Sequence, residues 1–482
     1  MGQIEPYGRL TMDYNTENIA EIAQQVVKAF QAAVAGHQQA GGEALTIADV
    51  ETGLRQFLRQ VGLQSLSQFL STGAGTPVAE IACACGGRLR YQRQRVATIT
   101  SVFGRLRYER AYYAGCRCGQ GKAPVDAQYG LEPGAVTSGL AALLSLGGIE
   151  FGFDESRGWL HPFLLFDVSE NTIRSETQTF GALQAEREQV LCDQSQDEAY
   201  LQARLRETQP MPARLYGSLD AAKVRIEPRA KAGEKPEKHE DWRDMKVGCW
   251  YEAEPVPPAQ RSTRQRDKFE REQVVLRATK MRYYCDIAEA DVFGKLVWGT
   301  GCVARADRVA ELVFVCDGAA WIWNLVAFHF SHAIQIVDWY HAADRLKRVA
   351  LAIWARSPER EAWLEATTND LWEGRVAEVI RACEPLASRH TEAQEAVTYF
   401  TNNAHRMKYD QFRQAGYLIG SGTIESGCKQ VVTERLKQPG AQWEVTGAVR
   451  TAKARAAWLS GDWEVLCAQR AALPLADLPL AA

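Results

Sequence analysis

The chain has 482 residues, of which 46% are hydrophobic and 24% charged. This length and composition predict a globular protein of two to four domains and exclude a coiled coil, a collagen-like chain and a largely disordered one. The net charge of -3 neither excludes nor indicates nucleic-acid binding, so charge has to be followed segment by segment. Met1–Tyr14 lacks the basic start and apolar run of a secretory signal, which predicts a cytoplasmic protein.

The N-terminal part of the chain predicts three regions. Residues 1–78 place apolar side chains at helical spacing and predict a helical region. Residues 79–130 predict a Cys-rich β-hairpin over 89–113, with its turn at Phe103–Gly104. Residues 131–210 return to helix. Within them, 154–163 and 170–181 predict a helix, a turn and a second helix, with Ser169 as the N-cap of the second.

Residues 211–355 predict an α/β core, because strands at 215–226, 246–253 and 282–285 precede two strand-to-helix units. These units are 312–315 into 319–330 and 334–337 into 341–355. The stretch 319–337 lacks acidic and basic residues but is interrupted by polar ones, which favours a buried core over a membrane span. Residues 356–415 predict a helical insertion, and 416–482 a Gly-rich turn that opens one last helix over 423–436. The expected fold class is therefore multidomain α+β.

Two close cysteine pairs bracket the predicted hairpin, although the chain has twelve cysteines in all. Four thiolates suit a tetrahedral structural Zn²⁺, and a glycine after each pair permits a tight turn around the sulfurs. The C-x-C spacing is tighter than the common C-x2-C spacing, and four unrelated cysteines remain the alternative. The predicted ligands are Cys83, Cys85, Cys116 and Cys118.

The same hairpin is strongly basic. Residues 86–122 hold nine basic residues against one acid, interleaved with tyrosines, which favours phosphate contact and base stacking over a merely solvated basic face. The arginines expected to contact DNA are Arg88, Arg90, Arg93, Arg95, Arg105 and Arg107. Segments 261–280 and 428–455 each carry a further net charge of +4.

The predicted helix pair at 154–181 suits either a DNA-binding helix-turn-helix or an ordinary helical hairpin. In the first case, Asn171, Arg174 and Gln178 would present polar groups to a major groove. Trp443, in a Gly-flanked basic segment, suits base stacking or, more commonly, a place in the core.

Three acids lie in apolar surroundings at the ends of predicted elements. Asp220 lies within one strand, Asp317 ends another, and Glu425 lies on the first turn of a helix. A carboxylate in such a setting is costly unless it is paired or bound to a metal. If the three converge, they offer an all-oxygen site for two Mg²⁺ (or Mn²⁺) ions, which catalyse phosphoryl transfer. Capping of turns is the alternative for each acid singly.

The order of these segments resembles an RNase H-like DDE transposase core. Asp338-Trp339-Tyr340-His341 looks like the D/C-x2-H element of Mutator-like transposases, and the stretch from Gly420 to Lys429 is similar to the region around the catalytic Glu of ISKra-type insertion-sequence transposases. The resemblance implies Asp220, Asp317 and Glu425 as the metal-binding triad. It also implies His341 near that triad, with a hydrogen-bonded core histidine as the alternative. Lys429, Arg435 and Lys437 would lie along the DNA.

The sequence therefore predicts a bacterial insertion-sequence transposase that binds terminal inverted repeats and performs Mg²⁺-dependent strand cleavage and transfer. Its expected partners are double-stranded DNA, as transposon ends and target, and further copies of itself on that DNA, with no membrane. The expected location is the cytoplasm, on the nucleoid when bound to DNA. The alternatives are a non-catalytic DNA-binding regulator derived from such an enzyme and a DNA nuclease with the same core.

Overall fold

The computed structural model describes residues 46–73, 76–208, 210–227, 241–257, 276–354 and 356–472, with isolated helical positions between 24 and 35. Most of the predicted helical region before residue 46 and the basic residues 261–271 lie outside the described residues. The chain is mixed α+β, as predicted. It divides into two compact units. One comprises Met1–Gly148, Phe153–Glu176 and Glu464–Leu480, and the other Ile149–Gly152, Thr177–Trp463 and Ala481–Ala482.

The first unit is built on a long β-hairpin. Strands β1 (Glu80–Ala82), β2 (Arg88–Ser101) and β3 (Gly104–Ala114) form an antiparallel sheet in that order. The turn lies at residues 102–103, one position earlier than predicted, and the amide of Phe103 donates to the Ser101 hydroxyl at 3.2 Å. Gly104 follows with a φ of 114°, a conformation that favours glycine.

The hairpin buries opposite faces in its two halves. Near the turn, Ile99 and Leu106 pack with Leu70 of helix α2 (Ile47–Gly73) in one hydrophobic cluster. Near the cysteines, where β2 carries a bulge between Tyr91 and Arg93, Leu89 and Tyr113 belong to a second cluster with Cys83. The bulge strengthens the twist of the ribbon, so the halves present different faces to the core.

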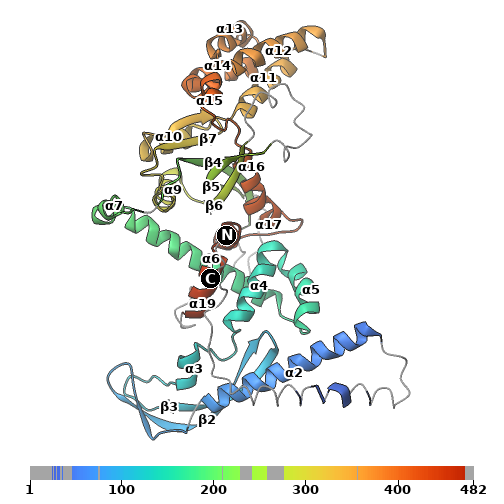
Figure 1. Cartoon of the computed structure of the whole chain (residues 1–482), viewed down its shortest axis with the longest axis vertical. Helices are drawn as coiled ribbons and strands as arrows, with labels where there is room; N and C mark the ends of the chain where they lie inside the picture. Colours follow the sequence, from blue (N-terminus) through green and yellow to red (C-terminus); the bar gives the residue numbers. More distant parts are fainter. Residues whose placement is uncertain are drawn as a thin grey trace. The chain divides into compact units, whose positions relative to one another are not determined.

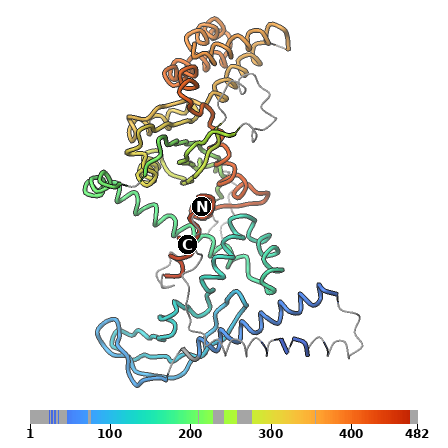
Figure 2. The backbone as a smooth tube through the Cα atoms, viewed as in Figure 1, coloured from blue at the N-terminus to red at the C-terminus, as the bar shows by residue number. Residues whose placement is uncertain are grey.

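Helix α2 also satisfies the free edge of β3, along which it runs (Figure 2). The Ser67 hydroxyl donates to the carbonyl of Arg107, and the amide of Glu109 donates to the Ser71 hydroxyl at 3.1 Å. These bonds pair groups that an exposed edge strand would leave open to other chains. The chain then continues through α3 (Pro124–Tyr129), α4 (Ser138–Glu150) and α5 (Phe153–Leu164).

The predicted helix pair is present, as α5 and α6 (Glu170–Gln194). Ser169 caps α6 as predicted, because its hydroxyl accepts from the amide of Thr172 at 3.1 Å. The end of α6 was predicted wrongly near residue 181, since its apolar positions continue and the helix runs from the first unit into the second. Helix α7 (Glu198–Arg204) follows.

The second unit contains a five-stranded mixed sheet in the order β6-β5-β4-β7-β8. Its antiparallel side pairs the central β4 (Arg214–Ile226) with β5 (Asp241–Pro255) and then β6 (Leu276–Asp286). Its parallel side pairs β4 with β7 (Glu311–Cys316) and then β8 (Ile334–Val337). The predicted strands are therefore all present, and β5 and β6 extend beyond the predicted bounds into charged sequence.

Helices complete this unit (Figure 1). Helix α9 (Ala290–Ala304) leads into β7, α10 (Ala320–His329) joins β7 to β8, and α11 (Trp339–Ile353) follows β8. The uncharged stretch 319–337 is thus helix and core strand, as predicted, and no helix within the described residues has the length and apolarity to cross a membrane. The predicted helical insertion consists of α12 (Pro358–Trp372), α13 (Val376–Ala387), α14 (Thr391–Asn403) and α15 (Tyr409–Gln414).

The C-terminal region differs from the prediction of one last helix. Helix α16 (Gly422–Cys428) passes through a π-helical turn (Lys429–Thr433) into α17 (Glu434–Leu436). Two further helices, α18 (Val445–Leu459) and α19 (Trp463–Ala472), follow. Helix α18 crosses α6 so closely that a Cβ on Gly181 would lie 1.8 Å from the carbonyl oxygen of Arg450. Its many buried alanines, which carry little amphipathic signal, allow this close approach.

Candidate functional site

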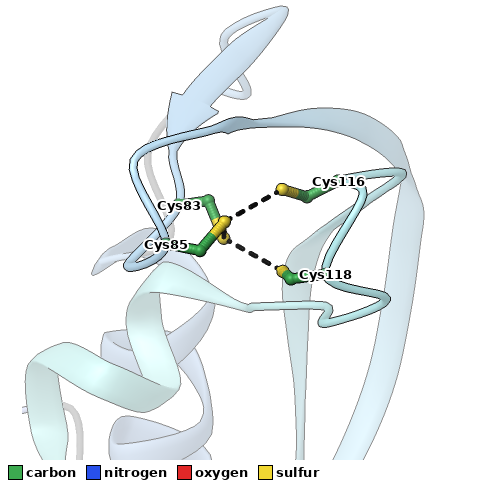
Figure 3. A group of neighbouring side chains, drawn as sticks. All are labelled: Cys83, Cys85, Cys116 and Cys118. Atoms are coloured by element: carbon green, nitrogen blue, oxygen red, sulfur yellow. Dashed lines mark hydrogen bonds between the residues drawn. The ribbon is translucent and has the colours of Figure 1, made fainter.

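The four predicted cysteines meet at the base of the hairpin, opposite its turn (Figure 3). Their sulfurs all lie within 4.8 Å of one another, with Sγ–Sγ distances of 3.4 Å for Cys83–Cys85, 3.3 Å for Cys85–Cys116 and 3.5 Å for Cys83–Cys118. A disulfide bond would bring two sulfurs to about 2.05 Å, and none of these cysteines forms one. Sulfurs around a tetrahedral Zn²⁺ at about 2.3 Å lie about 3.8 Å apart, so the cluster fits that ion.

Glycines shape the two loops that carry these cysteines. Gly86 and Gly119, each directly after a C-x-C pair, have φ of 84° and 76°. Their amides donate at 3.0 Å to the carbonyls of Cys83 and Cys116, closing one tight turn in each loop. A Cβ on Gly87 would lie 2.7 Å from the Cys116 sulfur, so a larger residue there would fill the space around the thiols. The predicted role of glycine in these loops is therefore confirmed.

Without a metal, the close approach of the thiols keeps Cys83 protonated. A hydrogen bond with the backbone of Cys85 lowers the pKa of Cys83, but hydrogen bonds among the thiols outweigh it and raise that pKa to about 12. A bound dication reverses this preference, because coordination deprotonates a thiol outright. The four cysteines could thus hold a metal such as zinc, whose role would be to fix the base of the hairpin.

The arginines of the hairpin fall into two groups. Arg88 and Arg90 both bond Glu80, at 3.1 and 3.2 Å, so β1 neutralises part of their charge. Arg93, Arg105 and Arg107 are exposed, and no ion pair links them to an acid in the described part of the hairpin. Arg95 lies over the Tyr112 ring, with its Cζ 3.5 Å from the centroid. The exposed basic face is therefore concentrated on Arg93, Arg105 and Arg107.

The three predicted recognition residues of α6 have different surroundings. Asn171 is exposed, and its Oδ1 accepts from Arg174 at 2.6 Å. Gln178 is half-buried, with its Nε2 2.9 Å from where a Cβ on Gly447 of α18 would lie. Asn171 and Arg174 thus lie on an accessible turn, whereas Gln178 packs against another helix.

Asp220, in the middle of β4, and Asp317 and Asp338, directly after β7 and β8, fall in one row when the strand register is extended. Residue 217 of β4 pairs with 314 of β7, and the same offset carried three residues further sets Asp220 level with Asp317. Residue 316 of β7 pairs with 337 of β8, and one step further sets Asp317 level with Asp338. Carboxyl ends of parallel strands are the usual place for a site in an α/β sheet.

The surroundings of Asp220 disfavour the charged form of its carboxyl group. Burial raises the pKa of Asp220, and the charge of Asp317 raises it further. A hydrogen bond from the Ala221 amide, at 2.7 Å, and one from the Cys428 thiol oppose these effects. The Cys428 contact brings α16, and with it Glu425, to the middle of β4, at Asp220. A divalent cation would relieve the repulsion between Asp220 and Asp317.

A fourth acid, Asp338, holds the ends of two helices together. Its side chain is fully buried. One oxygen accepts from the amide and Nδ1 of His341, at 2.5 and 3.1 Å, and so caps α11. The other accepts from the amide of Ser421, directly before α16. Burial raises the pKa of Asp338, but these hydrogen bonds more than offset it and hold that pKa below its usual value.

His341 lies between Asp338 and Glu425, with its Nδ1 3.6 Å from Glu425 Oε1. The hydrogen bond with Asp338 raises the pKa of His341 to about 9 despite partial burial, and Glu425 and Asp317 contribute to the shift. The imidazole is therefore a cation at neutral pH. The prediction that His341 lies near the acids is confirmed. His341 is also hydrogen-bonded, as the alternative interpretation expected.

The described residues contain two groups whose potential metal-donor atoms all lie within 4.8 Å of one another, the cysteines and Asp338–His341–Glu425. The predicted set Asp220, Asp317 and Glu425 is not such a group. Because both oxygens of Asp338 already accept hydrogen bonds, we assign it to positioning. No role was predicted for Asp338 beyond its place in the D/C-x2-H element. Its position directly after the apolar strand Ile334–Val337 indicated that it could belong to the site.

The basic C-terminal segment is less basic at its surface than its sequence indicates. Lys429 and Lys437 are exposed. Arg435 is only 1% exposed and lies over the Trp443 ring at 4.9 Å, so its prediction as a DNA contact is wrong: a buried guanidinium cannot reach a phosphate. Trp443 itself is buried, and its Nε1 donates to the carbonyl of Leu436 at 2.9 Å, which confirms the core alternative.

Two further basic residues of this segment are also buried. Lys453 bonds Glu188 and lies 3.1 Å from Asp286, while Arg455 bonds Glu150 at 2.9 Å and Glu434 at 3.1 Å. These ion pairs tie α18 to its neighbours in the second unit. Half of the basic residues counted in 428–455 therefore stabilise packing.

No protein-family model matches this chain, and no curated protein matches it significantly.

Replacing Cys116 and Cys118 together with Ser should remove the bound zinc and disorder the base of the hairpin, because a structural metal contributes its binding free energy to folding. We expect one zinc per wild-type chain by elemental analysis and faster amide exchange in β2 and β3 of the variant. Cys192→Ser, at a cysteine outside the cluster, should keep the zinc. Wild-type protein purified without chelator and free of zinc would contradict the assignment.

Asp338→Asn should lower the pKa of His341 from about 9 towards its usual value, because the amide cannot supply the charge that holds the imidazolium. A pKa raised on folding stabilises the fold fully below the ordinary pKa, and this contribution is lost as the pH rises through about 9. NMR titration of the imidazole resonances measures the shift. Asp344→Asn, one turn further along α11, should leave it unchanged, and an unshifted His341 in Asp338→Asn would refute the pairing.

Proposed function

We propose that this chain is a DDE-type transposase that cleaves and transfers DNA strands with the help of divalent metal ions. The observation that carries the proposal is the register of the parallel strands, which, extended by three residues, sets Asp220 level with Asp317. The hydrogen bond between Cys428 and Asp220 brings the helix of Glu425 to the same point of β4. The sheet, antiparallel on one side of β4 and parallel on the other, supports an RNase H-like core.

In this proposal Asp220, Asp317 and Glu425 hold Mg²⁺ or Mn²⁺. The chemistry that such ions supply is activation of a water or 3′-hydroxyl and stabilisation of the leaving oxygen in an in-line displacement. Asp338 fixes the first turns of α11 and α16, so it holds the His341 and Glu425 side chains at fixed positions relative to one another. The protonated His341 would then attract the phosphate that reacts.

The first unit would hold the DNA. The exposed arginines Arg93, Arg105 and Arg107 would contact phosphates, and a zinc-bound base would keep the two strands of the ribbon in register. The first turns of α6, with Asn171 and Arg174, would distinguish the terminal repeat from other sequences. In the two other proposals for the same chain, a nuclease would cleave without joining strands, and a regulator would bind without cleaving.

Asp220→Ala, Asp317→Ala and Glu425→Gln should each abolish Mg²⁺-dependent strand cleavage while binding to DNA is retained, because metal ions stabilise the transition state more than the bound ground state. We expect a loss of at least about 10²-fold. Plasmid nicking measures cleavage, and transfer of an oligonucleotide 3′-end distinguishes a transposase from a nuclease. Asp193→Asn, an exposed acid of α6, is the control. If one of the three variants still cleaves at the wild-type rate, the residue changed in it does not belong to the site.

Arg105→Ala with Arg107→Ala should weaken binding to all DNA sequences and reduce the salt dependence by about 0.9 units of slope per lost phosphate contact. Arg88→Ala with Arg90→Ala should change it less, because Glu80 already neutralises these side chains in part. Fluorescence anisotropy of a random duplex at several salt concentrations gives both slopes. Equal slopes in the first variant and wild type would show that the exposed arginines do not bind DNA.

A further inference from the structure

A pocket of about 230 Å³ borders the acid row, on the side of the helical insertion. Its polar lining comes chiefly from Asp317, His341, Arg345, Arg348 and Tyr399. The three basic residues belong to α11, at positions separated by four and three residues. Side chains at this spacing share one face of a helix, so a line of basic side chains, two of them arginines, leads away from Asp317.

Tyr399 forms the wall that the insertion contributes. A Cβ on Gly318 would lie 2.1 Å from Tyr399 Cε2, so the glycine after Asp317 allows α14 to approach the end of β7. The Cζ of Arg345 lies 4.7 Å from the centroid of the same ring. The aromatic face therefore holds this guanidinium next to the acid row.

The acids that face these arginines compete only weakly with an anionic ligand for the guanidinium groups. Arg345 lies 3.6 Å from Glu395, whose side chain is 62% exposed, and Arg348 bonds Asp344 at 2.9 Å, with both side chains largely in solvent. Exposed pairs of this kind contribute little to stability. A phosphate, which accepts bidentate bonds from a guanidinium, can replace them at little cost.

We propose that Arg345 and Arg348 bind backbone phosphates of the DNA strand that flank the phosphate reacting at Asp317. This rests on the proposed function. A helix rises about 1.5 Å per residue, so the stripe from His341 to Arg348 is about 10 Å long. At about 3.4 Å of rise per nucleotide, it spans about three nucleotides. The two arginines are thus positioning residues that hold the strand in line with the carboxylates.

The test uses full-length protein and fluorescein-labelled dT12 in Ca²⁺ buffer, with anisotropy measured at several salt concentrations. Every protein carries Arg105→Ala and Arg107→Ala, which reduces binding by the hairpin. Adding Arg345→Ala and Arg348→Ala should weaken binding about tenfold and lower the salt slope by about 1.4 units, at about 0.7 per phosphate contact. The single change Arg348→Ala, at an exposed side chain, should give about half of that slope and serves if the double variant does not fold.

Two arginines of the insertion are matched controls. Arg381 is exposed and pairs with Glu378 three residues before it, as Arg348 pairs with Asp344. Arg413 lies over the Trp372 ring at 3.9 Å, as Arg345 lies over Tyr399. Neither lines the pocket. Arg381→Ala and Arg413→Ala should leave the binding of dT12 and its salt slope unchanged.

Plasmid cleavage in Mg²⁺ separates this inference from the proposed function. If the wild-type protein does not cleave but Arg345 and Arg348 carry dT12 binding, the function is wrong and the phosphate pocket stands. If it cleaves, and the pocket variants bind and cleave like the controls, the pocket inference is wrong. Arg345→Lys should bind dT12 more tightly than Arg345→Ala but less tightly than wild type, because lysine keeps the charge and loses the fork.

Discussion

The parallel pairing of β4, β7 and β8 is the constraint on which the candidate site depends. Hydrogen bonds fix an offset of 97 residues between β4 and β7 and of 21 between β7 and β8, and these offsets align acids that are far apart in sequence. A slip of one residue would turn the side chains of a strand to the opposite face. In their parallel part β4 and β7 are buried on both faces, so a slip would exchange closely packed side chains, such as Leu219 and Val313, for neighbours of other shapes. Close packing of the buried strands therefore brings the carboxylates together.

Residues that follow the parallel strands stabilise the carboxylates of the acid row by hydrogen bonds. Asp338 is the most buried of the four acids, and both of its oxygens accept hydrogen bonds, from His341 and Ser421. These bonds stabilise its negative charge, and that charge in turn keeps His341 protonated. Asp220 is less well compensated, as its raised pKa shows. The two carboxylates therefore differ: the hydrogen bonds of Asp338 order two helix ends, whereas burial disfavours the charged form of Asp220.

Much of this could be predicted from the sequence, and the exceptions have physical reasons. The hairpin, the core strands and the cysteine cluster follow local signals, namely alternation, apolar runs and paired C-x-C spacing. The role of Asp338 depends on an amide 83 residues away, at Ser421, which no local pattern reveals. Helix α18 was missed because its small residues pack on all sides and leave little amphipathic periodicity. Gln178 belongs to the polar face of the predicted helix, and the packing of α18, which was not predicted, half-buries it.

The basic residues show why a count of charges does not locate a binding surface. In the segment 428–455, Arg435, Lys453 and Arg455 are buried against an aromatic ring or acids, so their charge serves packing. On the hairpin, alternation along β3 turns Arg105 and Arg107 away from the core, and in the described chain neither has an ion-pair partner. Exposed guanidinium groups without acids keep their full attraction for phosphates, whereas paired ones must first exchange a partner. The surface to which an anion is drawn is thus set by strand alternation and by the distribution of nearby acids.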